Sequence, residues 1–391
     1  MKNTFVEKLA SGFWGKTTAR KSVAGRSGST IRDLPSGTDY RLDALQRTRQ
    51  EAPIADRVAE QLLPQFPDLE WHIEKFRSSY HEFAETGVTL RDGFYSFRHL
   101  YFATQGVSNQ LISEGLSDLF PRPALPRRIS SIFGTFDQGE VQRMVDDLRR
   151  DGIVRVNPGL SPEYAQAFVA GVGFSESGES AAVTDNIEPL LHVPESKLLA
   201  TPIVNRIASD PLFYFVASEY LETEPILFRS AVWLSKPHNN SYDNLDNSAQ
   251  LFHVDMSIPK FLQVFLYLND VDENNGPHCM IPGTHREKPA ALWRDGRISD
   301  EEMVSLYPSE TWRLALGSAG TFFIVDTSAF HKGVAPVSGV RQVCSLGYIN
   351  TLFGEHLPIS PEAPRFQPKN FGPQVADFSP RFLSRFAMGL D

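Results

Sequence analysis

Cysteine is scarce in this sequence of 391 residues, which holds only Cys279 and Cys344. Two cysteines in so long a chain make no disulfide framework, so we expect a reducing compartment and a cytoplasmic protein. No apolar run approaches the roughly 20 residues that a membrane span requires, and we expect no membrane partner. Glu7 and Lys8 interrupt the apolar start of the chain, which argues against a secretory signal peptide.

An excess of positive charge is also lacking. The net charge is −9, which argues against nucleic acid as a partner. Residues 1–36 are the exception, because seven Lys/Arg face only Glu7 and Asp33 and give this stretch a charge of about +5. An organellar presequence is one interpretation of this basic, acid-poor stretch. We favour a mobile arm over residues 1–40 that is floppy or docks a partner.

Several signatures of familiar enzyme classes are missing. No Gly-rich loop of Walker or Rossmann spacing stands between a strand pattern and a helix pattern. No cysteine cluster suggests structural zinc, and no Gly-x-Ser-x-Gly motif suggests a serine hydrolase. The chemistry of this chain must therefore be sought among its histidines, carboxylates and arginines.

Residues 41–128 have a helical pattern. Asp68 is a plausible N-cap for a helix whose apolar stripe has positions i, i+3, i+7 and i+10. The stripe consists of Ile73, Phe76, Tyr80 and Phe83. The proline-rich segment 121–128, PRPALPRR, predicts a boundary. We expect a helical N-terminal region over 41–128 that covers a pocket or forms a homodimer.

The pattern changes after that boundary. Asp137 and Glu140 have capping-box spacing, and Ser161-Pro162, Thr201-Pro202 and Asp210-Pro211 predict the starts of short helices. From Ile226 onward, at least six short strands are separated by Gly, Pro and Asn turns. Such spacing favours a sandwich or barrel, and a jelly roll fits it. We expect a mainly β domain with helical decoration over 129–391.

The candidate site lies in this strand-rich part. His253 and Asp255 are two residues apart, so on a strand both side chains point to one face. His331 follows the buried strand predicted at 321–326 and can supply a third ligand from a neighbouring strand. Two imidazoles and one carboxylate form the facial triad of non-haem Fe(II) oxygenases. Arg341, ten residues later, has the planar fork that holds a carboxylate in a bidentate manner.

Other interpretations of these residues stay open. His253 and Asp255 alone are as well explained by a satisfied histidine at a capped strand end. His285 and Glu287 form a second His-x-Glu pair that also precedes His331, although the turn before them fixes their directions less.

Three stretches of sequence resemble the phytanoyl-CoA dioxygenase family of Fe(II)/2-oxoglutarate oxygenases. They read FHVD, FLYLNDVDENNGPHCMIPGTHR and FHKGVAPVSGVR, and the similarity extends over about 139–355. The resemblance implies a double-stranded β-helix, a cupin-like jelly roll closed around the metal. It implies that His253, Asp255 and His331 bind Fe(II) and that Arg341 pairs with the distal carboxylate of 2-oxoglutarate.

The resemblance also implies a reaction. A dioxygenase of this kind uses Fe(II), 2-oxoglutarate and O2, with ascorbate as a supporting reductant, and hydroxylates an unactivated carbon while releasing succinate and CO2. Related halogenases carry a small residue in place of the carboxylate, so Asp255 disfavours halogenation. Relatives often carry a basic residue where this chain has Gln263. An anionic substrate held from this strand is therefore not implied.

Further residues line the predicted pocket by position, each with a purely structural role as the competing interpretation. Candidates for contact with the cosubstrate are Gln250 and Phe265, and candidates for contact with the substrate are Arg229, Trp233, Gln263 and His278. We expect a small organic substrate; a CoA thioester, a secondary metabolite and an amino-acid derivative all fit. The alternatives are a non-catalytic jelly-roll binding protein and another metal-dependent cupin-type enzyme that does not use 2-oxoglutarate.

Overall fold

The structure is a computed structural model that describes residues 40–173, 190–238, 241–354, 371, 375 and 377–388. The predicted mobile arm, apart from residue 40, lies outside these residues. Within them, helices occupy more of the chain than strands, so the fold is mixed helix and antiparallel sheet rather than mainly β. None of the described helices is both long and apolar enough to cross a membrane.

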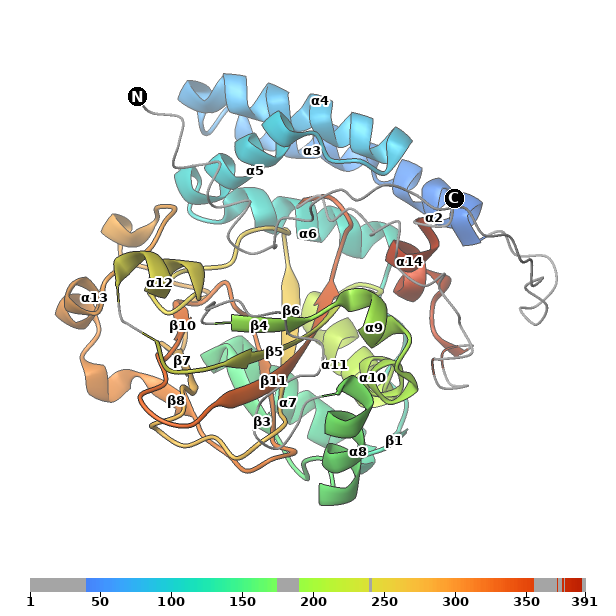
Figure 1. The fold of residues 1–391 in the computed structure, drawn as a ribbon. Coiled ribbons are helices and arrows are strands. Elements are labelled where there is room, and N and C mark those ends of the chain that lie inside the picture. Colours follow the sequence, from blue (N-terminus) through green and yellow to red (C-terminus); the bar gives the residue numbers. More distant parts are fainter. Residues whose placement is uncertain are drawn as a thin grey trace, which may run out of the picture.

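The first part of the described chain is helical. Its helices are α2 (Tyr40–Gln50), α3 (Ala52–Leu62), α4 (Glu70–Thr86), α5 (Arg91–Ala103) and α6 (Val107–Leu119). In Figure 1, α3, α4 and α5 lie on the far side of α6 from the sheets. The predicted stripe of α4 is confirmed, since all four of its residues are buried. Asp68 is not the N-cap, because it lies in a 3-10 turn (Pro67–Leu69) and Leu69 takes the cap position.

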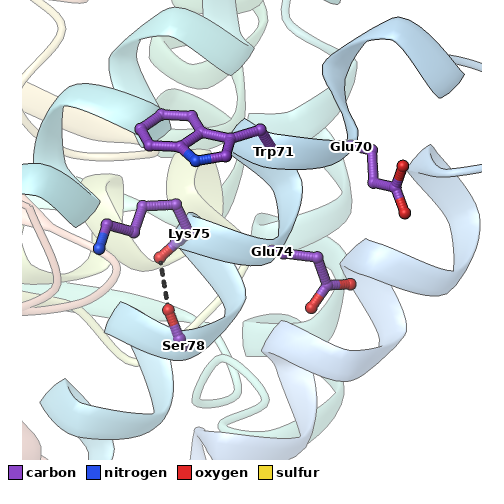
Figure 2. Close-up of a pocket in the computed structure, with 5 residues that line it drawn as sticks. All are labelled: Glu70, Trp71, Glu74, Lys75 and Ser78. Carbon is purple, nitrogen blue, oxygen red and sulfur yellow. Dashed lines mark hydrogen bonds between the residues drawn. The ribbon is translucent and has the colours of Figure 1, made fainter.

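Helix α4 has an outer face as well as a buried one. A shallow hollow of about 480 Å³ on this face is lined by Glu70, Trp71, Glu74, Lys75 and Ser78 (Figure 2). All five residues belong to one helix, and none of the predicted site residues lies among them. The hollow is therefore separate from the candidate site.

Eight further helices follow the N-terminal helical region, and four of them, α7, α8, α10 and α11, begin where the sequence predicted. The eight are α7 (Gln138–Asp151), α8 (Pro162–Val172), α9 (Glu195–Leu199), α10 (Pro202–Ala208), α11 (Pro211–Leu221), α12 (Tyr242–Asn247), α13 (Asp300–Leu306) and α14 (Ser384–Met388). The capping box of Asp137 and Glu140 is confirmed, with both reciprocal hydrogen bonds present. Ser161 and Asp210 likewise cap α8 and α11 through their side chains.

The strands form a hairpin and two larger antiparallel sheets. The hairpin pairs β1 (Arg128–Ser131) with β2 (Gly134–Asp137). The large sheet has the order β3 (Ile153–Val156), β9 (Phe322–Val325), β6 (Phe261–Tyr267), β11 (Arg341–Ile349), β5 (Ile226–Ser235) and β4 (Leu190–Val193). The small sheet has the order β10 (His331–Gly333), β7 (His278–Met280) and β8 (Arg313–Ala315).

The two faces of the large sheet have different neighbours. One face packs against α7, α8, α10 and α11 through a large apolar cluster that includes Leu262, Val264, Ile324 and Leu346. The other face shares a smaller cluster with the small sheet, to which Met280 and Ala315 contribute. Residues that alternate along a strand therefore point either to the helices or to the space between the sheets.

The helical region shares a core with the rest of the chain. Phe353, which follows β11, is fully buried in the aromatic cluster of the N-terminal helices. Its ring centroid lies 4.4 Å from that of Tyr80 and 5.4 Å from that of Phe83. Met256 from the loop before β6 joins the same cluster. Helices at the start of the chain thus pack on segments more than 130 residues later in the sequence.

A buried ion pair joins the start of α3 to a 3-10 helix more than 300 residues later. Arg381, which lies in a 3-10 helix (Pro380–Leu383), is 1% exposed, and its Nη2 atom lies 3.0 Å from Glu51 Oε1. Nη2 also donates to the backbone oxygen of Asn350, and Nη1 donates to that of Glu224. Glu51 also accepts hydrogen bonds from Tyr80 and Thr351. Both charges are therefore paired and hydrogen-bonded, as burial requires.

Replacing Arg381 with alanine should be strongly destabilising, because it leaves the carboxylate of Glu51 buried without a counter-charge. We expect the free energy of unfolding, measured by chemical denaturation, to fall by about 3–5 kcal/mol. The exposed pair of Arg57 with Asp118 provides a control, and Arg57→Ala should cost about 1 kcal/mol or less. Equal losses in the two variants would contradict the structural role assigned to Arg381.

Candidate metal centre

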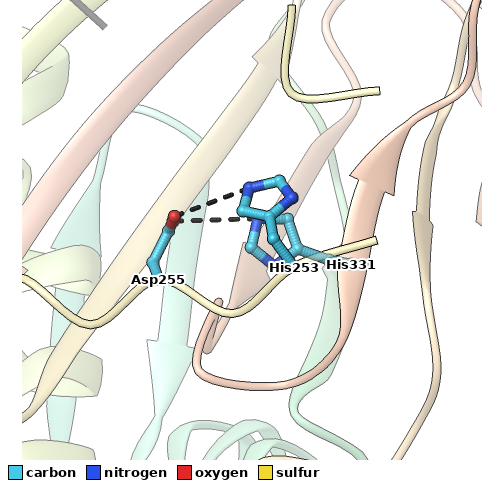
Figure 3. A group of neighbouring side chains, drawn as sticks. All are labelled: His253, Asp255 and His331. Atoms are coloured by element: carbon cyan, nitrogen blue, oxygen red, sulfur yellow. Dashed lines mark ion pairs between the residues drawn. The ribbon is translucent and has the colours of Figure 1, made fainter. Parts of the chain in front are cut away.

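The predicted triad is assembled at the edge of the small sheet. His253 and His331 form an isolated antiparallel bridge in which each backbone N–H donates to the other residue's carbonyl oxygen at 3.0 Å. The potential ligand atoms of His253, Asp255 and His331 all lie within 4.8 Å of one another. Figure 3 shows the Asp255 carboxylate facing both imidazole rings. The three residues converge from two segments that are 76 positions apart or more.

The backbone fixes which ring nitrogen of each histidine faces the centre. Nδ1 of His253 lies 2.8 Å from Leu251 O, and Nδ1 of His331 lies 3.0 Å from Ala329 O. A carbonyl oxygen only accepts, so each Nδ1 carries the proton and each Nε2 is left as a lone-pair donor. Burial and the neighbouring His331 lower the pKa of His253 well below its usual value, which keeps its ring neutral. A neutral imidazole is the form that binds a metal.

The separations in the triad suit an ion better than direct hydrogen bonds. Nε2 of His253 lies 3.6 Å from Asp255 Oδ1, and Nε2 of His331 lies 3.7 Å from Asp255 Oδ2. Both distances exceed hydrogen-bonding range, yet they fit three ligands that each lie about 2.1 Å from a common ion. The Asp255 backbone N–H donates to Thr327 O at 2.9 Å, which holds the carboxylate's segment against the loop before β10. The donor set fits a first-row transition metal.

Arg341 begins β11 on the face that looks into the space between the sheets. Its side chain is 6% exposed, and Nη2 donates to Ser235 Oγ at 3.2 Å. Its Nε is buried without a hydrogen-bond partner, and no carboxylate pairs with the guanidinium in the described part of the chain. A Cβ atom on Gly333 would lie 3.2 Å from Arg341 Nη2, so the bare glycine makes room for the guanidinium. Gly333 is two residues beyond His331 on β10.

Four other predicted residues share that face of the large sheet. Trp233 and Arg229 of β5 stand opposite Val343 and Gly347 of β11. Phe265 and Gln263 of β6 stand opposite Ser345 and Gly347 on the other side of the same strand. Residues directly opposite in a sheet point to the same face, and Trp233 and Phe265 belong to the cluster between the sheets. Gln263 also accepts a hydrogen bond from Ser345 Oγ at 2.6 Å.

The remaining two predicted residues lie close by on other elements. Gln250, which is 4% exposed, precedes the triad segment, and its Oε1 atom lies 2.8 Å from His238 Nε2. His278 opens β7, with its ring centroid 5.0 Å from that of Phe265 and 5.4 Å from that of His331. Burial, His331 and Arg341 lower the pKa of His278 well below its usual value, so its ring is neutral.

Three residues of the site were not predicted from the sequence. Ser235 binds the guanidinium of Arg341, and Gly333 makes room for it. Tyr267 donates its hydroxyl proton to Ala315 O and accepts from the His278 backbone N–H, which ties β6 to β7 and β8. The signal for Ser235 and Tyr267 was strand alternation, since each is an even number of residues from a predicted pocket residue on its own strand.

The rival pair does not join the triad. His285 Nε2 donates to Arg149 O at 3.1 Å, and Glu287 is exposed. His285 lines a cleft of about 980 Å³ between α6 and the loops that contain Lys260 and Asp326. Among the described residues, the metal-ligating group contains His253, Asp255 and His331, and neither member of the rival pair.

One family model matches more than half of the chain. Residues 136–342 match the family model described as phytanoyl-CoA dioxygenase (PhyH). Among solved structures, EctD from S. alaskensis with bound Fe aligns with 64% of this chain and 93% of its own, at 18% identity and a TM-score of 0.41. HygX from Streptomyces hygroscopicus with nickel, 2-oxoglutarate and hygromycin B aligns with 58% and 94%, at 14% identity and a TM-score of 0.42. No curated protein matches the chain.

The geometry predicts that the purified protein binds one divalent transition-metal ion and that His331→Ala abolishes the site. Loss of a residue that merely orients a ligand costs roughly 10- to 100-fold in affinity, so loss of a ligand should cost at least about 100-fold. Titration of the metal-free protein with Mn²⁺ or Co²⁺ measures this. His285→Ala is the matched control and should leave the affinity unchanged. Equal effects of the two substitutions would refute the assigned ligand set.

Proposed function

Because the chain belongs to the phytanoyl-CoA dioxygenase family, we propose that it is an Fe(II)- and 2-oxoglutarate-dependent dioxygenase. The observation that carries the proposal is the buried guanidinium of Arg341, which has no protein carboxylate to pair with in the described part of the chain. An unpaired buried charge is costly, and it persists where a ligand supplies the opposite charge. 2-Oxoglutarate carries a carboxylate at the end remote from its metal-chelating keto acid.

The protein's own residues would hold the two cofactors in place. His253, Asp255 and His331 would bind iron through two neutral Nε2 atoms and one carboxylate, leaving the opposite side of the ion open. Iron held there would supply the activation of O2 that no protein side chain provides. Arg341 would hold the far carboxylate of 2-oxoglutarate by a bidentate, charge-assisted pair and so fix the cosubstrate's orientation.

The reaction we propose is the hydroxylation of an unactivated carbon in a small organic molecule. One O2, one 2-oxoglutarate and one substrate C–H bond yield a hydroxyl group, succinate and CO2. Trp233 and Phe265 would shield the reacting carbon from water, because their side chains belong to the apolar cluster between the sheets. Arg229 and Gln263, on the same face two strands apart, are the polar groups we assign to substrate recognition.

Strand order supports a double-stranded β-helix over 129–391. Strands β5, β6, β9 and β11 lie together in the large sheet, while the segment at His253 and strands β7, β8 and β10 make up the small one. From β5 to β11 the chain passes back and forth between the two sheets, except that β7 and β8 follow each other within the small one, as in a jelly roll. We propose that the helical region over 41–128 covers the end of this barrel at which β6 starts. Cys279 and Cys344, both free and buried, are the reason to place the protein in the cytoplasm.

The activity test is the conversion of 2-oxoglutarate to succinate by the purified protein with Fe(II), O2 and ascorbate. We expect slow turnover without substrate and faster turnover when a cell extract supplies one. A protein that binds the metal but neither binds nor converts 2-oxoglutarate would instead be a binding protein or a different metal-dependent enzyme.

Arg341→Ala should raise the KM for 2-oxoglutarate by at least about 30-fold, because removal of one member of a buried charge pair costs about 2 kcal/mol or more. Metal affinity should not change. Arg313→Ala, at an exposed arginine of the small sheet that pairs with Asp151, is the control and should leave the KM unchanged. An unaltered KM in Arg341→Ala would remove the main support for 2-oxoglutarate.

A further inference from the structure

His278 is the one buried histidine between the sheets whose ring makes no hydrogen bond within the described residues. It is 6% exposed, and its Nε2 is completely buried without a partner. His253 and His331, in the same space, each place Nδ1 on the carbonyl oxygen two residues earlier in the chain. A buried ring nitrogen without a partner loses its hydration and gains nothing, so His278 has a donor or acceptor to offer.

His278 lies between the metal triad and Arg341, the two ends of the proposed cosubstrate site. On β7 it stands directly opposite Gly333 of β10, the residue over which the guanidinium of Arg341 lies. Its ring also lies 5.4 Å, centroid to centroid, from that of the metal-facing His331. A molecule that reaches from the metal triad to Arg341 would therefore pass the imidazole of His278.

We propose that His278 donates a hydrogen bond to the distal carboxylate of 2-oxoglutarate and shares that carboxylate with Arg341. The inference rests on the proposed function and extends it by one cosubstrate-binding residue. Arg341 already gives one N–H to Ser235 Oγ, which leaves part of its fork for the ligand. A carboxylate has about four acceptor sites, so a second donor beside the guanidinium completes its solvation in a dry pocket.

Two features favour the distal end over the metal end. His278 is not part of the group of side chains that can share an ion, so it is no fourth ligand in this arrangement. Its backbone N–H donates to the hydroxyl of Tyr267, which in turn donates to Ala315 O on β8. These two hydrogen bonds fix β7 in register, and the cross-strand pairing with Gly333 then directs the His278 ring towards the Arg341 end of the site.

The test compares two ligands in the Mn²⁺-loaded protein by calorimetric titration. One ligand is 2-oxoglutarate, and the other is 2-oxopentanoate, which keeps the keto acid but lacks the distal carboxylate. His278→Leu should weaken 2-oxoglutarate binding by about 10- to 100-fold, the usual effect of losing a hydrogen bond to a charged group. It should leave the binding of 2-oxopentanoate unchanged. His278→Gln, which restores an N–H donor, should recover most of the lost affinity.

The comparison separates the possible failures. If the wild-type protein does not bind 2-oxoglutarate, the proposed function and the role of His278 both fall. If the wild type binds it and His278→Leu binds it equally well, only the role of His278 falls. Equal weakening of both ligands would place His278 at the keto-acid end or mark a damaged fold, and either result overturns the proposal. Met280→Leu, an apolar substitution on the same face of β7, is the matched control and should bind both ligands as the wild type does.

Discussion

The candidate site depends on a single reciprocal contact between two short, distant segments. Two hydrogen bonds join the backbones of His253 and His331 and hold the two residues side by side, whichever rotamers their side chains adopt. Because each Nδ1 is then satisfied by its own chain, the Nε2 atoms have one orientation. Asp255 follows two residues after His253, and the hydrogen bond from its backbone N–H to Thr327 O holds its segment beside the two histidines. The ligand set is thus organised by the backbone in advance of the ion.

Two buried arginines show how differently this fold treats a desolvated charge. Arg381 is surrounded by partners from the protein itself, namely Glu51 and two carbonyl oxygens, and its role is to join distant parts of the chain. Arg341 is buried to a similar degree but receives one serine hydroxyl, and burial lowers its pKa. The first is a structural element, whereas the second is a binding element whose missing partner must come from outside the chain. The exposed fractions of the two side chains do not reveal this difference in role, whereas their hydrogen-bond partners do.

Much of this site could be predicted from the sequence because a strand's two-residue period converts spacing into direction. That rule placed His253 with Asp255, and applied to β5 and β6 it agrees with Trp233, Arg229, Phe265 and Gln263 on one face. Cross-strand register has no such local signal. Gly333 approaches Arg341, and the Tyr267 hydroxyl donates to Ala315 O on β8, because distant strands pair there. The sequence could not reveal these two contacts. The sequence predicts Asp68 as the N-cap of α4, but Asp68 belongs to the preceding 3-10 turn, and Leu69 takes the cap position instead.

The place of Phe353 constrains the order in which the chain can fold. Helices α4 and α5 are synthesised early, yet the aromatic ring that packs among Phe76, Phe83 and Phe97 belongs to a residue about 250 positions later. Such a long-range contact cannot form before Phe353 has been synthesised, so the nascent helices expose an apolar socket until then. Closure of that socket is therefore a late event in folding, and a chaperone would be of most use to this protein before it.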